Sequence, residues 1–314
     1  MADQALSQLS TQAARAQARR KRTYRTFILS ITYTIMVILA LWTVFPIVFT
    51  LVSSVKPDRI IFEDLRSLKA FVPTRFTLEN YSIVFERVPF ERFMLNSIIV
   101  STTTVIFSIF VNSMAAFSLA RLRWKGRKVI MMIIIALLII PFEAIAIPLL
   151  FIVNKFYWVD FGFSGGVHLE FTRSWLDSLH VQIIPFIADS FSIFLFYQTF
   201  LDIPKELDES ALVDGANPLR IYWSIFLPLS RPTIATVAIL QFLVRWNDYL
   251  WPVIAVPGEK ARPLTVGIAS FYTQTPEWGQ ILAYASMITV PVLIVFLLFQ
   301  KWFIRSVARS GIKG

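Results

Sequence analysis

Long apolar runs separated by polar stretches dominate the chain, and these runs predict its structural elements. Six of the runs are about as long as the ~20 residues that a helix needs to cross the hydrocarbon core of a bilayer. They cover about residues 27–52, 94–119, 129–153, 183–201, 233–254 and 281–304. The pattern therefore predicts an all-α polytopic membrane protein with six transmembrane helices.

One polar stretch, residues 203–228, lies between the fourth and fifth runs and predicts two short helices. Asp202 is a suitable N-cap for the first helix, and Pro204 can open it because the first helical position needs no amide donor. Gly215 is a natural left-handed stop for the same helix. The second helix starts in a similar way and ends at a proline, at Asn217-Pro218 and Leu227-Pro228 respectively.

The composition supports the membrane assignment. The chain of 314 residues is 56% hydrophobic and only 16% charged, and it contains 29 phenylalanines. A soluble core of this size cannot bury so much apolar surface. The sequence has no cysteine, which excludes disulfides, thiol catalysis and cysteine metal sites.

The positive charge of the chain is concentrated at the ends of the predicted spans. The net charge is +10, and basic residues cluster in residues 1–26, in the connector 121–128 and in the C-terminal tail. Because six spans place these three segments on one side, the positive-inside rule puts both termini in the cytoplasm. The stretch 203–228 then faces the cytoplasm too. This distribution argues against a nucleic-acid partner, and the first apolar run is too long for a signal peptide.

We therefore expect two regions, a cytoplasmic basic tail at residues 1–26 and a transmembrane domain at residues 27–314. Neither region contains a Walker-type phosphate loop, a Ser/His/Asp constellation or zinc-ligand spacing. His168 and His180 lie apart in the loop after the third run. The sequence thus predicts no catalytic residue, no metal site and no cofactor bound by this chain.

Polar groups inside the predicted fifth span are the strongest candidates for a site within the membrane. Arg245 and Asp248 each cost about 2.5–3.5 kcal/mol near a helix centre, so they need a partner or water. Their spacing allows an ion pair on a face that they share with Gln241. This face is either a packing device or part of a translocation path or gate. The nearby Asn247 and Tyr249 are further candidates for residues of this path or gate.

A second intramembrane candidate is Glu143, which lies between Pro141 and Pro148 in the third span. A carboxylate at this depth predicts a functional site by default. Pairing of Glu143 with Arg245 across the bundle is possible. Weaker candidates of the same kind are Asn112 and Asp189.

The stretch 203–228 resembles the EAA loop of binding-protein-dependent ABC importer permeases, and we call it the EAA loop. The resemblance rests on Glu209-Ser210-Ala211, Gly215, Ile225 and Leu227-Pro228; Ser210 stands where the family more often has alanine. It implies a type I ABC importer permease fold whose EAA helices dock on an ATP-hydrolysing subunit. The implied coupling residues are Glu209, Ser210, Ala211, Asp214, Gly215, Ala216, Ile225, Leu227 and Pro228.

Further segments are similar to the carbohydrate (MalG-type) branch of these permeases, namely residues 76–81, 246–252, 277–279 and 291–314. This resemblance implies a bacterial inner-membrane subunit of a sugar or oligosaccharide importer, embedded in lipid. Its implied partners are a second homologous permease, two ATPase subunits that bind ATP and Mg²⁺, and an extracytoplasmic solute-binding protein. In such relatives the partner permease holds most of the sugar.

Three alternatives remain open at this point. The same machine can import a polyol, a glycerol-phosphate ester or an osmolyte. An ion-coupled secondary transporter would use Glu143 and Asp248 as carriers, but it leaves the EAA pattern unexplained. A membrane scaffold without transport would not need the charged residues of the fifth span.

Overall fold

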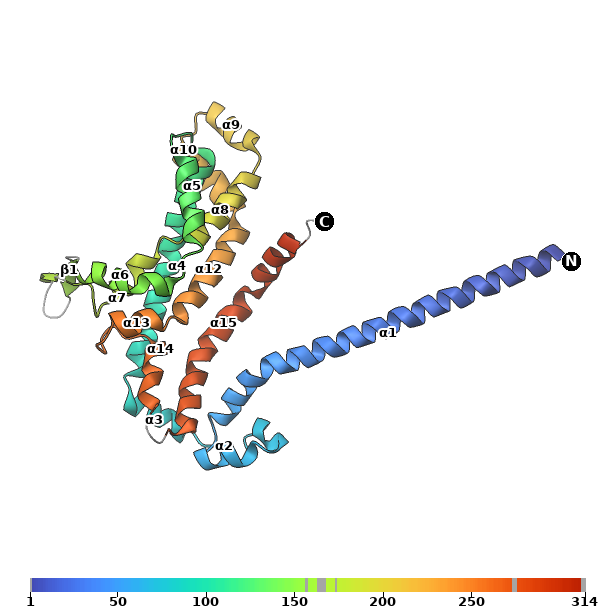
Figure 1. Cartoon of the computed structure of the whole chain (residues 1–314), viewed down its shortest axis with the longest axis horizontal. Coiled ribbons are helices and arrows are strands. Elements are labelled where there is room, and N and C mark those ends of the chain that lie inside the picture. Colours follow the sequence, from blue (N-terminus) through green and yellow to red (C-terminus); the bar gives the residue numbers. More distant parts are fainter. Residues whose placement is uncertain (1, 156–157, 163–167, 173, 273–275, 312–314) are drawn as a thin grey trace.

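The architecture is almost entirely helical. The computed structural model describes residues 2–155, 158–162, 168–172, 174–272 and 276–311 (Figure 1). Within these residues the strands are limited to an antiparallel hairpin of β1 (Trp158–Gly162) and β2 (His168–Thr172). The all-α prediction is confirmed except for this hairpin, which lies where we expected only a loop.

The N-terminal helix, α1 (Ala2–Ser53), runs without a break through the expected boundary at residue 26. It projects away from the other helices (Figure 1). Every side chain from Thr23 to Pro46 is exposed, although this stretch is strongly apolar. Only the C-terminal part of α1 packs against the bundle. The exposed surface must therefore face lipid or another protein.

The centre of the bundle is α4 (Phe90–Arg121), which packs against α8 (Ser190–Asp202) and α12 (Arg231–Trp246). The last long helix, α15 (Trp278–Gly311), packs against α12 and α1. The interior face of α4 contains, beside apolar residues, a row of small polar residues, which let neighbouring helices approach closely. These buried residues are Ser97, Ser101, Thr104, Ser108, Asn112 and Ser113.

The predicted third span is broken into α5 (Arg127–Leu137) and α6 (Phe142–Lys155), which are bent by 108°. Pro141 lies in the break, and Ile140 precedes it. A proline has no amide hydrogen and disfavours the helical conformation of the residue before it. The sequence therefore identified the apolar run and the prolines that can kink it, but not the size of the bend.

The fourth span is also interrupted. It consists of α7 (Leu179–Ile183), η2 (Ile184–Phe186) and α8, which together cover Leu179–Asp202. Asp189 starts α8, because its carboxylate accepts the amide hydrogen of Ser192 at 2.7 Å.

The predicted end of the fifth span is wrong. We expected a helix over residues 233–254, but α12 ends at Trp246 and α13 (Leu250–Ala255) is a separate helix. The carboxylate of Asp248 pairs with Arg245 and also accepts the amide hydrogen of Trp251 at 3.4 Å. Such a side chain competes with the helical backbone, so it favours a break at this point.

A second bend lies before α12. The segment formed by α10 (Pro218–Ile221), η3 (Tyr222–Phe226) and α11 (Leu227–Leu229) meets α12 at 77°. Among the described residues, four helical stretches are long and apolar enough to cross a membrane; the number is six if each bent pair counts as one span. The prediction of six spans therefore agrees with the structure when each bent pair is counted as one span.

The two ends of the bundle carry different short elements (Figure 1). At one end lies α9 (Lys205–Val213), and near the other lie α2, η1, α3, α14 and η4. We call residues 54–87, which include α2, η1 and α3, the opposite lobe. The bounds of these elements are Asp58–Asp64, Leu68–Phe71, Glu79–Arg87, Leu264–Gly267 and Ile268–Phe271.

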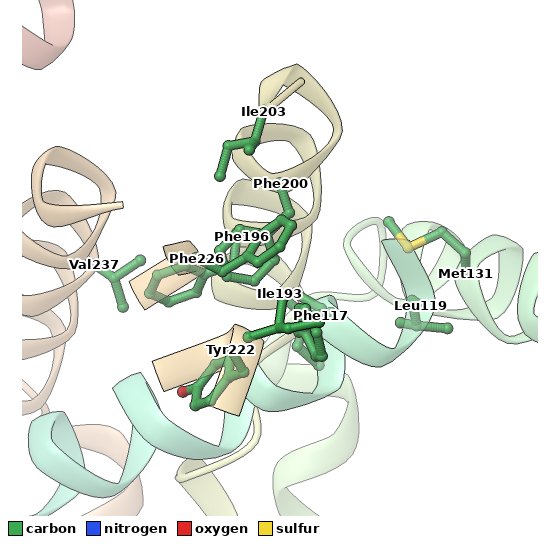
Figure 2. Close-up of a cluster of buried hydrophobic side chains, with 12 residues drawn as sticks. Phe117, Leu119, Met131, Ile193, Phe196, Phe200, Ile203, Tyr222, Phe226 and Val237 are labelled. Atoms are coloured by element: carbon green, nitrogen blue, oxygen red, sulfur yellow. The ribbon is translucent and has the colours of Figure 1, made fainter. Parts of the chain in front are cut away.

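An aromatic cluster joins the bundle to the EAA loop (Figure 2). It brings together Phe117 from α4, Phe200 from α8 and Phe226 from η3. The ring centres of Phe117 and Phe226 are 5.0 Å apart, and those of Phe200 and Phe226 are 5.4 Å apart. These edge-to-face contacts are the favourable geometry for aromatic pairs, so they fix the second EAA-loop helix on α4 and α8.

Candidate functional site

The first EAA-loop helix, α9, contains no buried residue. Its N-cap is Pro204, and no side chain caps it. The prediction that Asp202 caps this helix is wrong, because α8 continues through Asp202 and the extended residues Ile203 and Pro204 follow before α9 begins. Glu206 and Asp208 lie in the first turn, where the helix dipole favours negative charge.

The turn between the two EAA-loop helices has the predicted geometry. Gly215 has a left-handed φ of +78°, and the amide of Ala216 donates to the carbonyl of Ala211 at 2.9 Å. A Cβ at Gly215 would meet no atom within 4 Å, so glycine is favoured there by its φ angle and not by a lack of space. Asn217 then caps α10 by accepting the amide hydrogen of Arg220 at 2.8 Å.

The nine predicted coupling residues divide between an outer and an inner face. The exposed ones are Glu209, Ser210, Asp214, Gly215 and Pro228. The half-buried ones, Ala211, Ala216, Ile225 and Leu227, pack on the core of the bundle. The EAA loop thus presents one free polar face with small residues on it.

Two apolar residues that we had not singled out extend this free face. Leu212 is 54% exposed and Val213 is 88% exposed. Apolar side chains clustered on a protruding polar helix are typical of a protein-docking surface. The sequence feature that could have identified Leu212 and Val213 is their position at the end of a helix whose other residues are mostly charged.

The second EAA-loop helix contains a π-helical turn at η3 and ends at Leu229, one residue after the predicted end at Pro228. The hydroxyl groups of Tyr222 in this turn and Ser113 on α4 are 2.7 Å apart. Turns of this kind are rare and are found often at functional sites.

An ion pair ties α9 to the bundle. Nη1 of Arg121, the last residue of α4, lies 3.3 Å from Oδ1 of Asp208, and the two side chains are 5% and 19% exposed. From the sequence, Arg121 was only one charge of the basic connector. Its partner is far away in the chain, so its role had no local signal.

Gln241 and Arg245 of the fifth span border a cavity of about 190 Å³ between η2–α8 and α12. We call it the polar cavity. Its polar lining consists of Asp189, Ser192, Gln241 and Arg245. It therefore includes Asp189, which the sequence had offered only as a weaker candidate.

The predicted ion pair at this cavity forms. Nη1 of Arg245 lies 2.9 Å from Oδ2 of Asp248, and the side chains are 11% and 16% exposed. The guanidinium of Arg245 also stacks over the ring of Phe186, 4.0 Å from its centre. Gln241, one turn earlier on α12, donates to the hydroxyl of Ser192 at 3.2 Å. Arg245 therefore contacts Phe186 of η2 as well as Asp248, and Gln241 joins the same face of α12 to α8.

A hydrogen-bond network fixes the wall of the cavity. Asn112 on α4 accepts the amide hydrogen of Asp189 and donates to the carbonyl of Ile187, both at 3.0 Å. The carboxylate of Asp189 accepts from the amide and the hydroxyl of Ser192, both at 2.7 Å. The break between η2 and α8 is therefore clamped to α4.

The other path candidates lie outside the polar cavity. Glu143 is exposed on α6, and the ion pairs of the described residues do not join it to Arg245. The pairing of these two residues, which the sequence left possible, does not form, because the guanidinium of Arg245 pairs with Asp248. Asn247 is exposed and donates to the carbonyl of Leu243 at 2.8 Å; Tyr249 is 49% exposed.

The described residues contain no cluster of three or more His, Cys, Asp or Glu side chains that could hold a metal ion. His180 lies on α7 against the ring of Trp175, 5.5 Å between ring centres. His168 lies on β2. Both histidines are therefore placed in the region that joins α6 to α8.

Comparison with known proteins assigns the chain to a family. Residues 112–309 match the model of the binding-protein-dependent transport system inner membrane component. The chain belongs to this family. It is a multi-pass inner-membrane permease subunit of a binding-protein-dependent ABC importer, and both the EAA loop and the polar cavity lie inside the matched region. In this family the permease is not itself catalytic, and ATP is bound by an ATPase partner.

Curated relatives of this permease transport different solutes. The arabinooligosaccharides transport system permease protein AraQ of Halalkalibacterium halodurans is 31% identical, over 88% of this chain and 93% of its own length. The sn-glycerol-3-phosphate transport system permease protein UgpE of Yersinia pestis is 26% identical, over 88% of this chain and 94% of its own length. The permease thus belongs to a carbohydrate-type branch that also contains a glycerol-3-phosphate transporter.

A solved structure confirms the fold. The permease resembles a chain of a bacterial ABC transporter involved in the import of the acidic polysaccharide alginate, with a TM-score of 0.72 and 24% sequence identity. The similarity covers 88% of this chain and 96% of the other. The predicted importer-permease fold is therefore confirmed over most of the chain.

Proposed function

We propose that this permease carries a neutral sugar or oligosaccharide across the membrane, driven by ATP hydrolysis in its partner. The observation that carries the proposal is the similarity to an arabinooligosaccharide permease over 88% of the chain. Sugar hydroxyls need hydrogen-bonding side chains rather than net charge. Gln241 and the ion pair of Arg245 with Asp248 supply such groups along α12.

A glycerol-phosphate ester is the second candidate, because UgpE is also a relative. The charges of the polar cavity favour the neutral cargo. Asp189 and Asp248 provide two carboxylates for the single guanidinium of Arg245, which already carries Asp248 as its partner. A phosphate is best held by an arginine fork that is free to form two bonds. On this side of the path there is no such fork among the described residues.

We assign the translocation path to the side of α12 that carries Gln241 and Arg245, together with Asp248 in the break after α12. Asn247 and Tyr249 are exposed at the end of α12 and would contact the partner permease across the path. Glu143 is exposed on α6. In this proposal it contributes less directly to the path than Gln241 and Arg245 do.

The second homologous permease would cover surface that this chain leaves free. The exposed apolar stretch of α1 from Thr23 to Pro46 is long enough to need either lipid or a partner helix along most of its length. A heterodimer buries part of this surface and closes the path between two chains. Lipid covers the remainder.

The EAA loop would face the cytoplasm and bind one ATPase subunit of a dimer. Support comes from the exposed face of α9 and from the basic connector 121–128, which lies at the same end of the bundle. Both termini are then cytoplasmic. The solute-binding protein docks at the far end of the bundle, where the opposite lobe lies.

Transport would proceed by alternating access. ATP can shift the permease between inward-open and outward-open states only if the ATPase dimer binds the two states with different affinity. Movement of the EAA loops supplies that difference, because the loops are the contact between the ATPase and the spans. In this proposal Glu209, Gly215 and the Leu227-Pro228 turn transmit the movement.

The test is recovery of the tagged chain from native membranes in mild detergent, with its partners identified by mass spectrometry. We expect an ATPase and a second permease. The co-purified or genetically adjacent binding protein is then titrated with arabinotriose, maltotriose and sn-glycerol-3-phosphate. Binding of a sugar supports the proposal, and binding of glycerol phosphate alone overturns the neutral cargo.

A separate experiment addresses the ion-coupled alternative. The chain is purified alone and placed in liposomes without ATP, with a proton gradient across the membrane. Uptake of the bound solute under these conditions would overturn the ATP-driven mechanism. No uptake until the ATPase subunits and ATP are added is the expected result.

A further inference from the structure

Four segments of the permease meet at one side chain, that of Arg121 at the C-terminus of α4. We propose that Arg121 is a positioning residue that links α9 rigidly to α4 and α8, so that displacement of α9 is passed into the transmembrane helices. This inference rests on the proposed docking of the ATPase at the EAA loop. It adds a residue outside that loop to the coupling machinery.

The first link is to the end of α8. Nη2 of Arg121 donates to the carbonyl of Phe200 at 2.6 Å and also to the carbonyl of Ile203. Carbonyl groups in the last turn of a helix have no partner within the helix. A cation placed there satisfies them and interacts favourably with the helix dipole. The guanidinium thus joins the ends of two spans.

The second link is to the EAA loop itself. Nη1 of Arg121 contacts Oδ1 of Asp208 in the first turn of α9 at 3.3 Å. The same guanidinium lies over the ring of Phe226 in η3, 4.8 Å from its centre. Figure 2 shows Phe226 beside Phe200, with Ile203 at the end of the same helix as Phe200. One buried cation therefore contacts both EAA-loop helices and the end of α8.

The rest of α9 is weakly attached. None of its residues is buried, and Ala211 is the member of this helix that packs on the bundle core. Without the Arg121 contacts, α9 would be held by the chain on either side and by this small apolar contact. Force applied to α9 would then turn the helix about its ends instead of moving α4 and α8.

Arginine is needed at this position because its planar fork can donate to several acceptors while one face stacks on an aromatic ring. A lysine keeps the charge but offers a compact ammonium without that fork. Losing a charged hydrogen bond typically shifts a local equilibrium by about tenfold. We therefore expect Arg121→Lys to increase the population of detached α9 by about tenfold.

The first measurement is a distance between α9 and α4 in the complete importer. Because the chain has no cysteine, Lys205→Cys on α9 and Ile106→Cys on the exposed side of α4 give two unique spin-label sites. The expected distance distribution is narrow in the parent, with or without ATP and vanadate. In Arg121→Lys it broadens, and ATP with vanadate shifts it.

The matched control is Arg123→Lys, an exposed arginine on the same connector that makes no ion pair within the described residues. It should keep the narrow distribution. If Arg121→Lys prevents assembly, Asp208→Asn replaces it, since this change removes the ion pair and keeps the side-chain shape. A distribution in Arg121→Lys or Asp208→Asn identical to that of the parent would overturn the proposal.

A second readout separates coupling from simple loss of stability. Labelling of Val244→Cys beside the polar cavity by a water-soluble maleimide is followed with and without ATP and vanadate. In Arg121→Lys the response to nucleotide should be lost while ATP hydrolysis persists; a retained response would contradict the proposal. If the parent itself shows no response, the assigned path fails, and the distance measurement still decides the role of Arg121.

Discussion

The two ends of this permease are constructed in opposite ways. At the EAA end, α9 has no buried residue and exposes Val213 almost completely. At the other end, Lys56 is fully buried and donates to Asp64 at 3.0 Å and to the carbonyls of Lys69 and Ala70. The helix α9 has no buried residue of its own, whereas the opposite lobe is held together by buried polar groups.

The difference also lies in how each end is joined to the spans. In the opposite lobe, Asn80 donates to the carbonyls of Ser54 and Lys56, both at 2.9 Å, and Tyr81 bridges the hydroxyls of Ser54 and Ser286, both at 2.8 Å. These bonds fasten the end of α1 to α3 and α15. A lobe bonded in this way is joined to the spans by several contacts, whereas α9 is joined to them mainly through Arg121.

The largest expected effect comes from removing the cation of the opposite lobe. Lys56→Met leaves the carboxylate of Asp64 without its ammonium partner in a buried position, and two carbonyls lose their donor. We expect the greatest fall in melting temperature of all the variants, measured in detergent by intrinsic fluorescence. The control is Lys69→Met, whose side chain is exposed. Equal melting of the two variants would show that the lobe is not fixed by this contact.

The next effect lies between the two ends, at the polar cavity. Asp248→Asn leaves the buried guanidinium of Arg245 unpaired, and Arg245→Gln does the reverse. Each change should destabilise the chain by about 3 kcal/mol. The double variant should be more stable than the sum of the two predicts, by about 1–3 kcal/mol. Additive effects in thermal unfolding would mean that the ion pair is not energetically coupled.

A smaller effect on folding, but a clear effect on assembly, is expected at the EAA end. Gly215→Asp and Gly215→Asn both tolerate the left-handed φ, and the space around the new side chain is open. Each substitution should lower the free energy of unfolding by about 1 kcal/mol or less. Only the aspartate brings charge to the docking surface, so it alone should reduce co-purification of the ATPase. Equal recovery of the ATPase with both variants would remove Gly215 from the contact.

The smallest effect is a change in pH dependence within the opposite lobe. The hydroxyl of Thr74, 2.8 Å from the carboxylate, and the ammonium of Lys56 hold the pKa of Asp64 below its ordinary value of 3.8. A lowered folded-state pKa adds stability above the unfolded pKa, and this stability is lost as the pH falls through the folded pKa. Thr74→Val raises that pKa and so reduces the contribution.

The measurement is the melting temperature from pH 6 down to pH 3 for the parent and Thr74→Val. The difference between them should be largest above the ordinary pKa and should shrink as the pH falls below it. Ser82→Ala removes a hydroxyl that donates to the carbonyl of Glu79 and serves as the pH-independent control. A difference that does not change with pH would exclude Asp64 as its cause.

Local signals in the sequence predicted several local features correctly, although the cap at Asp202 was wrong. Gly215 was identified from the left-handed conformation that glycine favours, and Asn217-Pro218 from capping chemistry. The ion pair of Arg245 with Asp248 was also predicted, although Asp248 lies just beyond the end of α12 and not on its helical face. Each of these features depends on residues within a few positions of one another, where the geometry of a helix is known in advance.

Features that depend on distant segments were not predicted. Arg121 meets Asp208 across 87 positions, and Lys56 meets Asp64 only because the opposite lobe folds into a compact turn. Pairing of Glu143 with Arg245 was left possible, but Glu143 is exposed on α6 and Arg245 pairs with Asp248. Hydropathy finds apolar runs without giving the direction that a chain takes after a proline.

The central claim is that the free face of α9 is where the ATPase binds. The direct test is a photo-crosslinker attached to Val213→Cys in the complete importer in native membranes, with Leu68→Cys, 85% exposed on the opposite lobe, as the matched site. The account predicts that the ATPase subunit is crosslinked from Val213→Cys and not from Leu68→Cys. An ATPase crosslinked from Leu68→Cys, or from neither site, would contradict it.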